Sequence, residues 1–478
     1  SSTFRPVGGG WLTAQWRSHR RMAGWFAAYL ALQAYAVAGL PTPRFPDTAS
    51  YLKLSFIGSD SRPWTVPLFY KLLPTDTLRI CGQVVVAAIA WWVLAAVVAG
   101  MLGNRRLRIG ARLVVLLLGL TGPIVEWNST ILSESLSISL TALLVAGWLS
   151  YVRRPRPASA AWALLATLLW TFTRPDHVDI GVLITVAGIV AGLWRRDRLR
   201  LAVAGVLVLI STAGFVTINR NNATTTARIA DIVQGRVLPN AARTTWFIEH
   251  GMPYDATMAA NAGNYFGAPL LADPAFAHWA STRGEHVYLE YLWSHPGYTL
   301  WQPLAAISGE RPSLDVPAPS QVLTPNPTPS LLSPTANYGR HRDLLPEPVQ
   351  ALLFEQGQIG DVLALGLLTL ALVGLAWRRR RLDSRMVVPA VALVCCVPEV
   401  FLVWLADPIE LDRHAVVLAV ALRIALWVLA AVAADQLLQR KSAPPAVAAT
   451  PLPRAATALG WPDGRDRLHS GLTVDGRS

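Results

Sequence analysis

Ten long apolar segments constrain this chain more than any other feature of its sequence. They cover residues 22–40, 81–102, 112–125, 131–151, 158–173, 178–194, 200–218, 358–376, 386–405 and 414–434. A helix needs about 20 apolar residues to cross the hydrocarbon core of a bilayer. Only 15% of the residues are charged, against about 25% in soluble domains. The sequence therefore predicts an all-α integral membrane protein with a bundle of about ten transmembrane helices.

The distribution of charge predicts how these segments are oriented. With the N-terminus in the cytoplasm, 26 of the 42 basic residues fall in cytoplasmic segments, 15 fall outside and Arg423 lies within a span. Only six of the 29 acidic residues are on the cytoplasmic side. This is the positive-inside pattern of membrane proteins, so the net charge of +13 does not indicate a nucleic-acid partner. We expect a multi-pass protein of the plasma membrane, in contact with the lipid bilayer, with both termini in the cytoplasm.

The same topology predicts the organisation of the chain. Segment 22–40 lacks the small-residue cleavage site of a signal peptide, so we interpret it as a permanent span. Three cysteines, all in apolar runs, argue against a disulfide-stapled scaffold. The predicted parts are a cytoplasmic N-terminus (1–21), spans 1–7 (22–218) with a first outer loop (41–80), an extracytoplasmic loop domain (219–357), spans 8–10 (358–434) and a disordered cytoplasmic tail (435–478). The loop domain is expected to hold amphipathic helices, one of them after Asp273-Pro274, followed by a proline-rich stretch without regular structure.

Ionisable side chains gather where the spans meet the outer face. Such groups at membrane depth are costly and are functional candidates by default. The cytoplasmic ends of the spans carry only arginines and short turns, so any chemistry belongs on the outer side. The outer set is Asp47, Glu126, Glu134, Arg174, Asp176, Asp407, Glu410, Asp412, Arg413 and His414, with Glu399 inside span 9.

The first outer loop is the most informative stretch. In Phe45-Pro-Asp-Thr-Ala-Ser-Tyr51, Thr48 or Ser50 is suited to cap a helix. Tyr51 lies one turn after Asp47 and shares its face. The alternative reading makes Asp47 itself a helix cap and Asp60 a plain loop residue.

Two other sites hold charges that need partners. Glu134 is expected about one turn into span 4, where it pairs with Arg174 or Arg62 or faces a wet cavity. Arg413 at the start of span 10 opposes the helix dipole, which indicates an anionic partner; a salt bridge to Asp407 or Glu410 is the alternative.

Short motifs in this order resemble GT-C glycosyltransferases, which are polytopic enzymes that use polyprenyl-phosphate-linked sugars. The motifs are PDTxSY after the first span, RPWTVPLFY in the first outer loop, LSESL entering span 4, TRP closing span 5 and DRH opening span 10. His414 departs from the pattern, because many relatives have a tyrosine after the arginine. The resemblance implies a GT-C-like bundle.

The resemblance also implies a mechanism and a set of site residues. Asp47 corresponds to the general base that activates an acceptor hydroxyl, with inversion at the sugar. Arg413, with His414 or Arg174, would stabilise the polyprenyl phosphate leaving group, and Glu134 would orient the acceptor or hold an arginine. Asp47 and Arg413, remote in the chain, are then expected to meet across one crevice. Arg62 and Tyr51 complete the expected substrate-binding set. No cofactor is required, and a divalent cation is optional because phosphate is already a good leaving group. No Cys or His pair has zinc spacing, which argues against metal ligands among Glu285, His286, Glu290 and His295 of the outer loop.

The expected partners are a polyprenyl-phosphate sugar donor and a glycan, lipid or protein acceptor of the cell envelope. The Ala-, Val-, Arg- and Pro-rich composition resembles that of actinobacteria, and family analogy then implies an arabinofuranosyl or mannosyl donor. The main alternative is a membrane transporter or flippase for lipid-linked sugars, and a membrane scaffold is a third. The enzyme is favoured because the ionisable residues lie at the outer rim, whereas transporters bind their substrates near the midplane.

Overall fold

The computed structural model describes residues 9–55, 62–195, 197–219, 222–263, 268–308, 331–334, 338–354, 359–378, 383–406 and 411–439. Over these residues the regular structure consists of helices, without a strand, as the sequence predicts. Seven of the described helices are long and apolar enough to cross a membrane. They are α4 (Asp76–Met101), α7 (Glu134–Arg153), α9 (Asp176–Arg195), α10 (Arg198–Asn219), α19 (Gly360–Arg378), α20 (Val387–Ala406) and α21 (Leu411–Gln439).

The other three expected spans do not form single helices that are long and apolar enough to be counted with these seven. Residues 22–37 of segment 22–40 belong to α1 (Gly9–Val37), which ends three residues earlier than the expected span and is not among the seven. Segment 158–173 forms α8 (Pro157–Thr171), which is apolar but only 15 residues long. Segment 112–125 is broken: α5 (Arg105–Leu118) meets α6 (Gly122–Val125) and the 3₁₀ turn η1 (Glu126–Ser129) at an angle of 56°. The break falls at Gly-Leu-Thr-Gly-Pro (119–123), where Thr121 is the extended N-cap of α6 with ψ of 145° and Pro123 lies in the first turn of α6.

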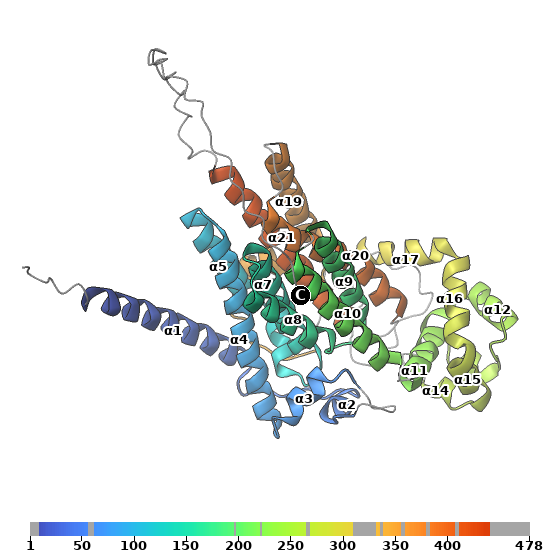
Figure 1. Ribbon diagram of the computed structural model, residues 1–478. Coiled ribbons are helices and arrows are strands. Elements are labelled where there is room, and N and C mark those ends of the chain that lie inside the picture. Colours follow the sequence, from blue (N-terminus) through green and yellow to red (C-terminus); the bar gives the residue numbers. More distant parts are fainter. Residues whose placement is uncertain are drawn as a thin grey trace, which may run out of the picture.

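The core of the bundle is built on α4, α7 and α21. Between 56% and 83% of the most apolar window of each helix is buried, whereas α19 is 17% buried and lies at the edge. Alanines on α4 let the backbones approach closely, and Ala88, Ala90 and Trp91 are fully buried. Figure 1 shows these helices side by side in one bundle, with α1 along one flank.

A buried irregular segment between α5 and α7 positions the first residue of α7. Backbone polar groups at membrane depth need internal partners, and three side chains supply them. The Tyr70 hydroxyl donates to the Leu132 carbonyl at 2.6 Å, and Gln83 Nε2 donates to the carbonyls of Asn128 and Thr130 at 3.1 and 2.9 Å. Gln33 Nε2 donates to the Gly119 carbonyl at 2.7 Å. The segment is thereby fixed, and with it the place where α7 begins.

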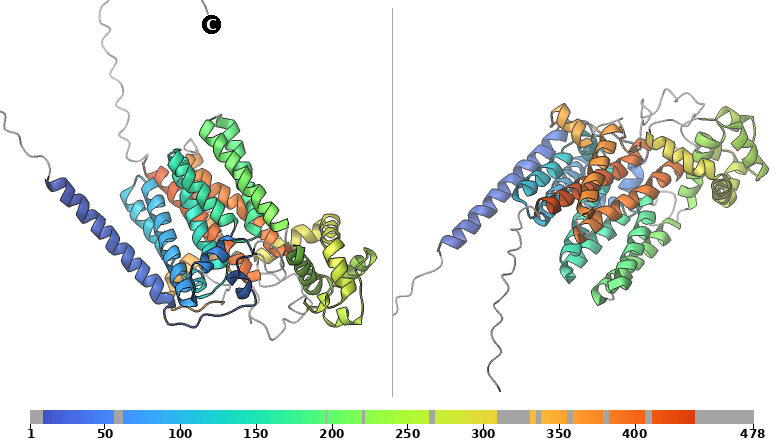
Figure 2. Two further views of the ribbon diagram at one scale, coloured as in Figure 1. Left: turned by 60° about the horizontal axis from the view of Figure 1, so that its bottom comes forward. Right: turned by 90° about the horizontal axis from the view of Figure 1, so that it is seen from above.

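A second group of helices, here called the lateral domain (residues 222–308), has its own hydrophobic core. It lies beside the bundle on the side away from α1 in Figures 1 and 2. Its elements are α11 (Asn222–Ile232), η2 (Val233–Val237), α12 (Ala241–Glu249), α13 (Ala256–Ala260), α14 (Ala268–Leu271), α15 (Pro274–Trp279), η3 (Ala280–Gly284), α16 (Glu285–Ser294) and α17 (Pro296–Ser308).

The helix expected after Asp273-Pro274 is present. Asp273 caps α15, and its side chain accepts a hydrogen bond from the Ala275 amide at 2.8 Å. Most of the proline-rich stretch (309–330) lies outside the described residues, so its predicted lack of regular structure stays a prediction. The tail was predicted as 435–478, but residues 435–439 form the end of α21, and residues 440–478 lie outside the described residues. After the stretch the chain forms α18 (Glu347–Phe354).

Candidate functional site: a chain of ion pairs at one end of the bundle

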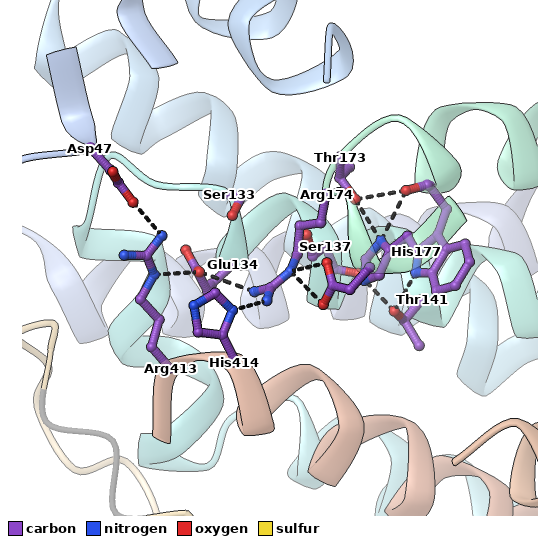
Figure 3. A network of polar contacts seen from close by, with 12 residues as sticks. Asp47, Ser133, Glu134, Ser137, Thr141, Thr173, Arg174, His177, Arg413 and His414 are labelled. Carbon is purple, nitrogen blue, oxygen red and sulfur yellow. Dashed lines mark hydrogen bonds and ion pairs between the residues drawn. The ribbon is translucent and has the colours of Figure 1, made fainter. Parts of the chain in front are cut away.

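Charged side chains from four separate segments meet at one end of the bundle (Figure 3). Asp47 precedes α2 (Thr48–Leu52), and Glu134 is the first residue of α7. Arg174 lies between α8 and α9, and Arg413 and His414 lie in the first turn of α21. The sequence analysis placed these residues on one side of a membrane, and the structure brings them into direct contact.

Asp47 and Arg413 are in contact although they are 366 positions apart. Asp47 Oδ2 accepts from Arg413 Nη2 at 2.9 Å, and Oδ1 accepts from Arg62 Nη2 at 2.7 Å. The Asp47 side chain is 31% exposed and that of Arg413 only 4%. Asp47 occupies the N-cap position of α2, but its side chain makes no capping hydrogen bond. Asp47 therefore lies at the cap position, as the alternative reading has it, but its side chain makes ion pairs and does not cap the helix.

Glu134 joins two of the arginines. Its Oε1 accepts from Arg413 Nε at 2.8 Å and from Arg174 Nη1 at 3.1 Å, and its side chain is fully buried. Arg174 was one of the two partners expected for Glu134; Arg62, the other, pairs with Asp47 instead. Glu134 is the first residue of α7 and not one turn into the helix, because the irregular segment continues to Ser133. At this position the helix dipole favours its negative charge.

Arg174 extends the chain of ion pairs beyond Glu134. Its Nε donates to both carboxylate oxygens of Asp176, at 3.0 and 3.2 Å. Its Nη2 contacts Nδ1 of His414. Pro175 follows Arg174 and separates α8 from α9. The guanidinium is thus shared between two helix N-termini, those of α7 and α9.

The polar network continues to His177, which the sequence analysis did not single out. The His177 ring stacks on Trp170 with centroids 4.0 Å apart, and its Nδ1 lies 2.8 Å from the Thr173 hydroxyl. The Trp170 indole donates to Thr141 on α7 at 2.9 Å. The sequence feature that could have identified His177 is the run Thr173-Arg-Pro-Asp-His177, in which every polar residue takes part in the network.

The first-loop residues Tyr51 and Arg62 also belong to the site. The Tyr51 hydroxyl donates to Ser133 Oγ at 3.1 Å, and the Arg62 guanidinium lies over the Tyr51 ring at 5.2 Å. Arg62 Nε donates to Ser50 Oγ at 2.9 Å. Burial raises the pKa of Tyr51, so its hydroxyl stays protonated. Asp60, Asp407 and Glu410 lie outside the described residues.

The electrostatics of the site keep its outermost carboxylate ionised. Burial alone raises the pKa of Asp47, but Arg62 and Arg413 outweigh it and lower that pKa below its usual value. The ionised carboxylate therefore stabilises the fold at every pH above the ordinary aspartate value of about 3.9. This contribution is lost as the pH falls through the lower pKa of the folded state. Asp176 and Glu134 outweigh the burial of Arg174 and raise its pKa.

A cavity of about 390 Å³ lies next to this network, between α7, α9 and α20. Its walls are mostly apolar and include Trp148, Ile184 and Val391. Trp170, which stacks on His177, forms part of its wall, and so does the buried carboxyl group of Glu399. The cavity extends from Trp170 to the opposite ends of these helices, where Tyr151, Arg195 and Arg200 line it, so only its Trp170 end borders the charged network.

Two further charged residues noted in the sequence lie away from the network. Arg423 donates to the Leu332 carbonyl at 2.7 Å and to Ser333 Oγ at 2.8 Å. Glu126 is buried, and its Oε2 lies 3.9 Å from His341 Nδ1. Within the described ranges, no group of three or more His, Cys, Asp or Glu side chains is arranged to hold a metal ion.

A search of protein-family models found no match to this sequence, and neither did a search of curated proteins. The resemblance to GT-C glycosyltransferases thus rests on its short motifs. The function of the chain is therefore inferred from the geometry of the site.

Proposed function

We propose that the chain is an inverting glycosyltransferase that moves a sugar from a polyprenyl-phosphate donor to a cell-envelope acceptor on the extracytoplasmic face of the plasma membrane. The observation that carries this proposal is the placement of Asp47. It is an ionised, partly exposed carboxylate at the rim of a cluster of arginines. An activating base beside a cationic anion site is what transfer from a phosphate-linked donor requires.

In the proposed reaction Asp47 takes the proton of an acceptor hydroxyl. The acceptor oxygen forms a bond to the anomeric carbon while the bond from that carbon to the phosphate oxygen breaks, with inversion. The electron pair of the broken bond leaves with the polyprenyl phosphate, and Asp47 then releases its proton to water. A positioned base contributes about 10²–10⁴ in rate.

The cations of the site stabilise the negative charge on the departing phosphate. Arg62, which is 24% exposed, and the partly exposed His414 are accessible to a ligand, whereas the buried Arg413 stands behind Asp47. Guanidinium groups suit phosphate because they offer paired donors in a plane. A bound phosphate also draws positive charge away from Asp47, which raises its basicity when the donor is present.

Glu134 has a supporting role in this scheme. It is fully buried and bonds to Arg413 and Arg174, so it positions arginines and does not itself touch the acceptor. The hydrogen bond between Tyr51 and Ser133 connects the first outer loop to the start of α7. This connection holds Asp47 next to Arg413. The apolar cavity beside Trp170 suits the hydrocarbon part of a lipid-linked substrate.

The test uses the purified full chain in detergent or liposomes with a panel of radiolabelled polyprenyl-phosphate sugars, arabinofuranose and mannose first. The expected result is release of polyprenyl phosphate together with labelled product. A control without acceptor separates transfer from hydrolysis. If none of the donors is turned over, the proposal that the chain is a glycosyltransferase is wrong.

The cavity between α7, α9 and α20 also favours a second candidate function, a transporter or flippase for lipid-linked sugars. In that case the cavity is part of a path across the bilayer, and Glu399 is a polar group along it. Liposomes distinguish the two functions, because a flippase changes which leaflet holds the labelled lipid and leaves its glycosidic bond intact.

A further inference from the structure

Helix α17 is the longest described helix of the lateral domain, and it carries no charged residue. Its 13 residues, Pro-Gly-Tyr-Thr-Leu-Trp-Gln-Pro-Leu-Ala-Ala-Ile-Ser, include no Asp, Glu, Lys, Arg or His. At 1.5 Å per residue it is about 20 Å long, which is too short to cross the roughly 30 Å hydrocarbon core of a bilayer. An apolar helix of this length either packs inside a protein or lies at a membrane surface.

One face of α17 packs on the spanning helix α20. Ala306 is buried in a cluster with Val400, Val403 and Trp404 of α20. These residues are within the last seven of α20, which ends at Ala406, so α17 contacts it within about 9 Å of its end. Figure 1 shows α17 between the bundle and the rest of the lateral domain. Because α17 packs near this end of α20, it lies at the height of the membrane leaflet around that end.

The opposite face of α17 exposes large apolar side chains. Leu300 is 55% exposed, Trp301 70% and Leu304 44%. These positions follow helical spacing and lie on one face, whereas Pro303 and Ala306 are buried. Exposure of three neighbouring apolar side chains to water is costly, and tryptophan is enriched where proteins meet the bilayer interface.

This exposed face continues the exposed apolar surface of the candidate span α20. Val387, Val394 and Val397 of α20 are 51–68% exposed and follow one stripe of that helix. The stripe ends at Val397, one turn before the residues on which α17 packs. The one charged residue of α20, Glu399, is only 4% exposed and lines the cavity, and α17 has none, so the apolar surface of the span passes onto α17 without an exposed charge between them.

We propose that α17 is embedded in the membrane leaflet at the network end of the bundle, with Leu300, Trp301 and Leu304 in contact with lipid hydrocarbon. The partner of this surface is the bilayer, not another protein. The lateral domain is then held from two directions. The bundle holds it through the Tyr288 hydroxyl, which donates to the Leu405 carbonyl at 2.7 Å, and through Arg236, which lies 4.3 Å over Trp404; the leaflet holds it through α17.

The test places a nitroxide label at Trp301→Cys or Leu304→Cys in the full chain, reconstituted in nanodiscs. Cys81 is exchanged for serine, since it is the exposed cysteine, and Cys395 and Cys396 are buried. Collisions with oxygen, which concentrates in lipid, are compared with collisions with a water-soluble nickel chelate. Val394→Cys on the stripe of α20 is the lipid reference.

An exposed residue of the lateral domain, Glu249→Cys on α12, is the water reference. We expect labels at 301 and 304 to match Val394, with high oxygen collision and several-fold lower nickel collision than at Glu249. Nickel collision equal to that at Glu249 would overturn the proposal. Protection from both reagents would overturn it as well, because it would mean that protein covers the face.

Discussion

Replacement of Glu134 by glutamine tests whether the arginines at the site depend on one buried carboxylate. The change keeps the shape of the side chain and removes its charge. Glu134 is fully buried and accepts from two guanidinium groups, at 2.8 and 3.1 Å. Removal of one partner from a buried ion pair costs about 3–5 kcal/mol, because it leaves a buried charge uncompensated.

The expected loss is at the lower end of this range. In the variant Arg413 keeps Asp47, and Arg174 keeps Asp176, so neither arginine is left without a carboxylate. We therefore predict that Glu134→Gln lowers the free energy of unfolding by about 3 kcal/mol. At about 2 °C per kcal/mol for large domains, the apparent Tm falls by about 6 °C.

The assay is thermal unfolding of the purified protein in detergent, with Glu399→Gln as the matched control. Glu399 is also buried at membrane depth, and no ion pair links it to another described residue. The same chemical change there is expected to alter the free energy of unfolding by less than about 1 kcal/mol. Equal effects of the two replacements would refute the reasoning, since burial alone would then explain the loss.

Three further changes have distinct expected outcomes. Arg62→Ala removes a cation from Asp47, so the pKa of Asp47 rises and the acid limb of kcat/KM moves up by about 1 pH unit. Tyr51→Phe removes one buried hydrogen bond and lowers the free energy of unfolding by about 1 kcal/mol, measured by thermal unfolding. Gly339→Ala puts a Cβ 2.0 Å from the Glu126 carbonyl oxygen, and the overpacking costs about 3 kcal/mol or more, seen as loss of monodisperse protein in detergent.

Two of these changes, Arg62→Ala and Gly339→Ala, have an outcome that would contradict the reasoning. A pH profile of Arg62→Ala that overlies the wild-type profile would show that Asp47 does not set the acid limb. Gly366→Ala on α19 is the control for Gly339, because a Cβ there meets nothing within 4 Å. If both glycine variants fold equally well, the close approach to Glu126 does not constrain the fold.

The sequence predicted the membrane class, the segments that form helices and the meeting of Asp47 with Arg413. The first two inferences depend on hydropathy, which acts on each residue locally. The meeting of Asp47 with Arg413 was implied by the resemblance of short motifs to GT-C glycosyltransferases. The sequence could not predict the 56° break between α5 and α6. That break is stabilised by Gln33 and Gln83 from other helices, and it is also why α7 begins at Glu134.

The position of α17 was hidden for a similar reason. From the sequence its 13 residues are a short apolar run within a long loop. Only its packing on Val400 and Val403 of α20 shows its depth relative to a span. His177 was missed because a single histidine has no spacing pattern of its own, and its role depends on the stacking partner Trp170.

The central claim is that Asp47 is the base of a sugar-transfer reaction, and the rate of transfer by Asp47→Asn tests it most directly. The wild type, Asp47→Asn and Asp76→Asn are compared with the best donor from the panel, and thermal unfolding confirms that each is folded. Asp76 is the control because it also pairs with arginines in the first-loop region but lies outside the network. We predict at least a roughly 10²-fold lower kcat for Asp47→Asn and a wild-type rate for Asp76→Asn. A folded Asp47→Asn protein that transfers sugar at the wild-type rate would contradict the account.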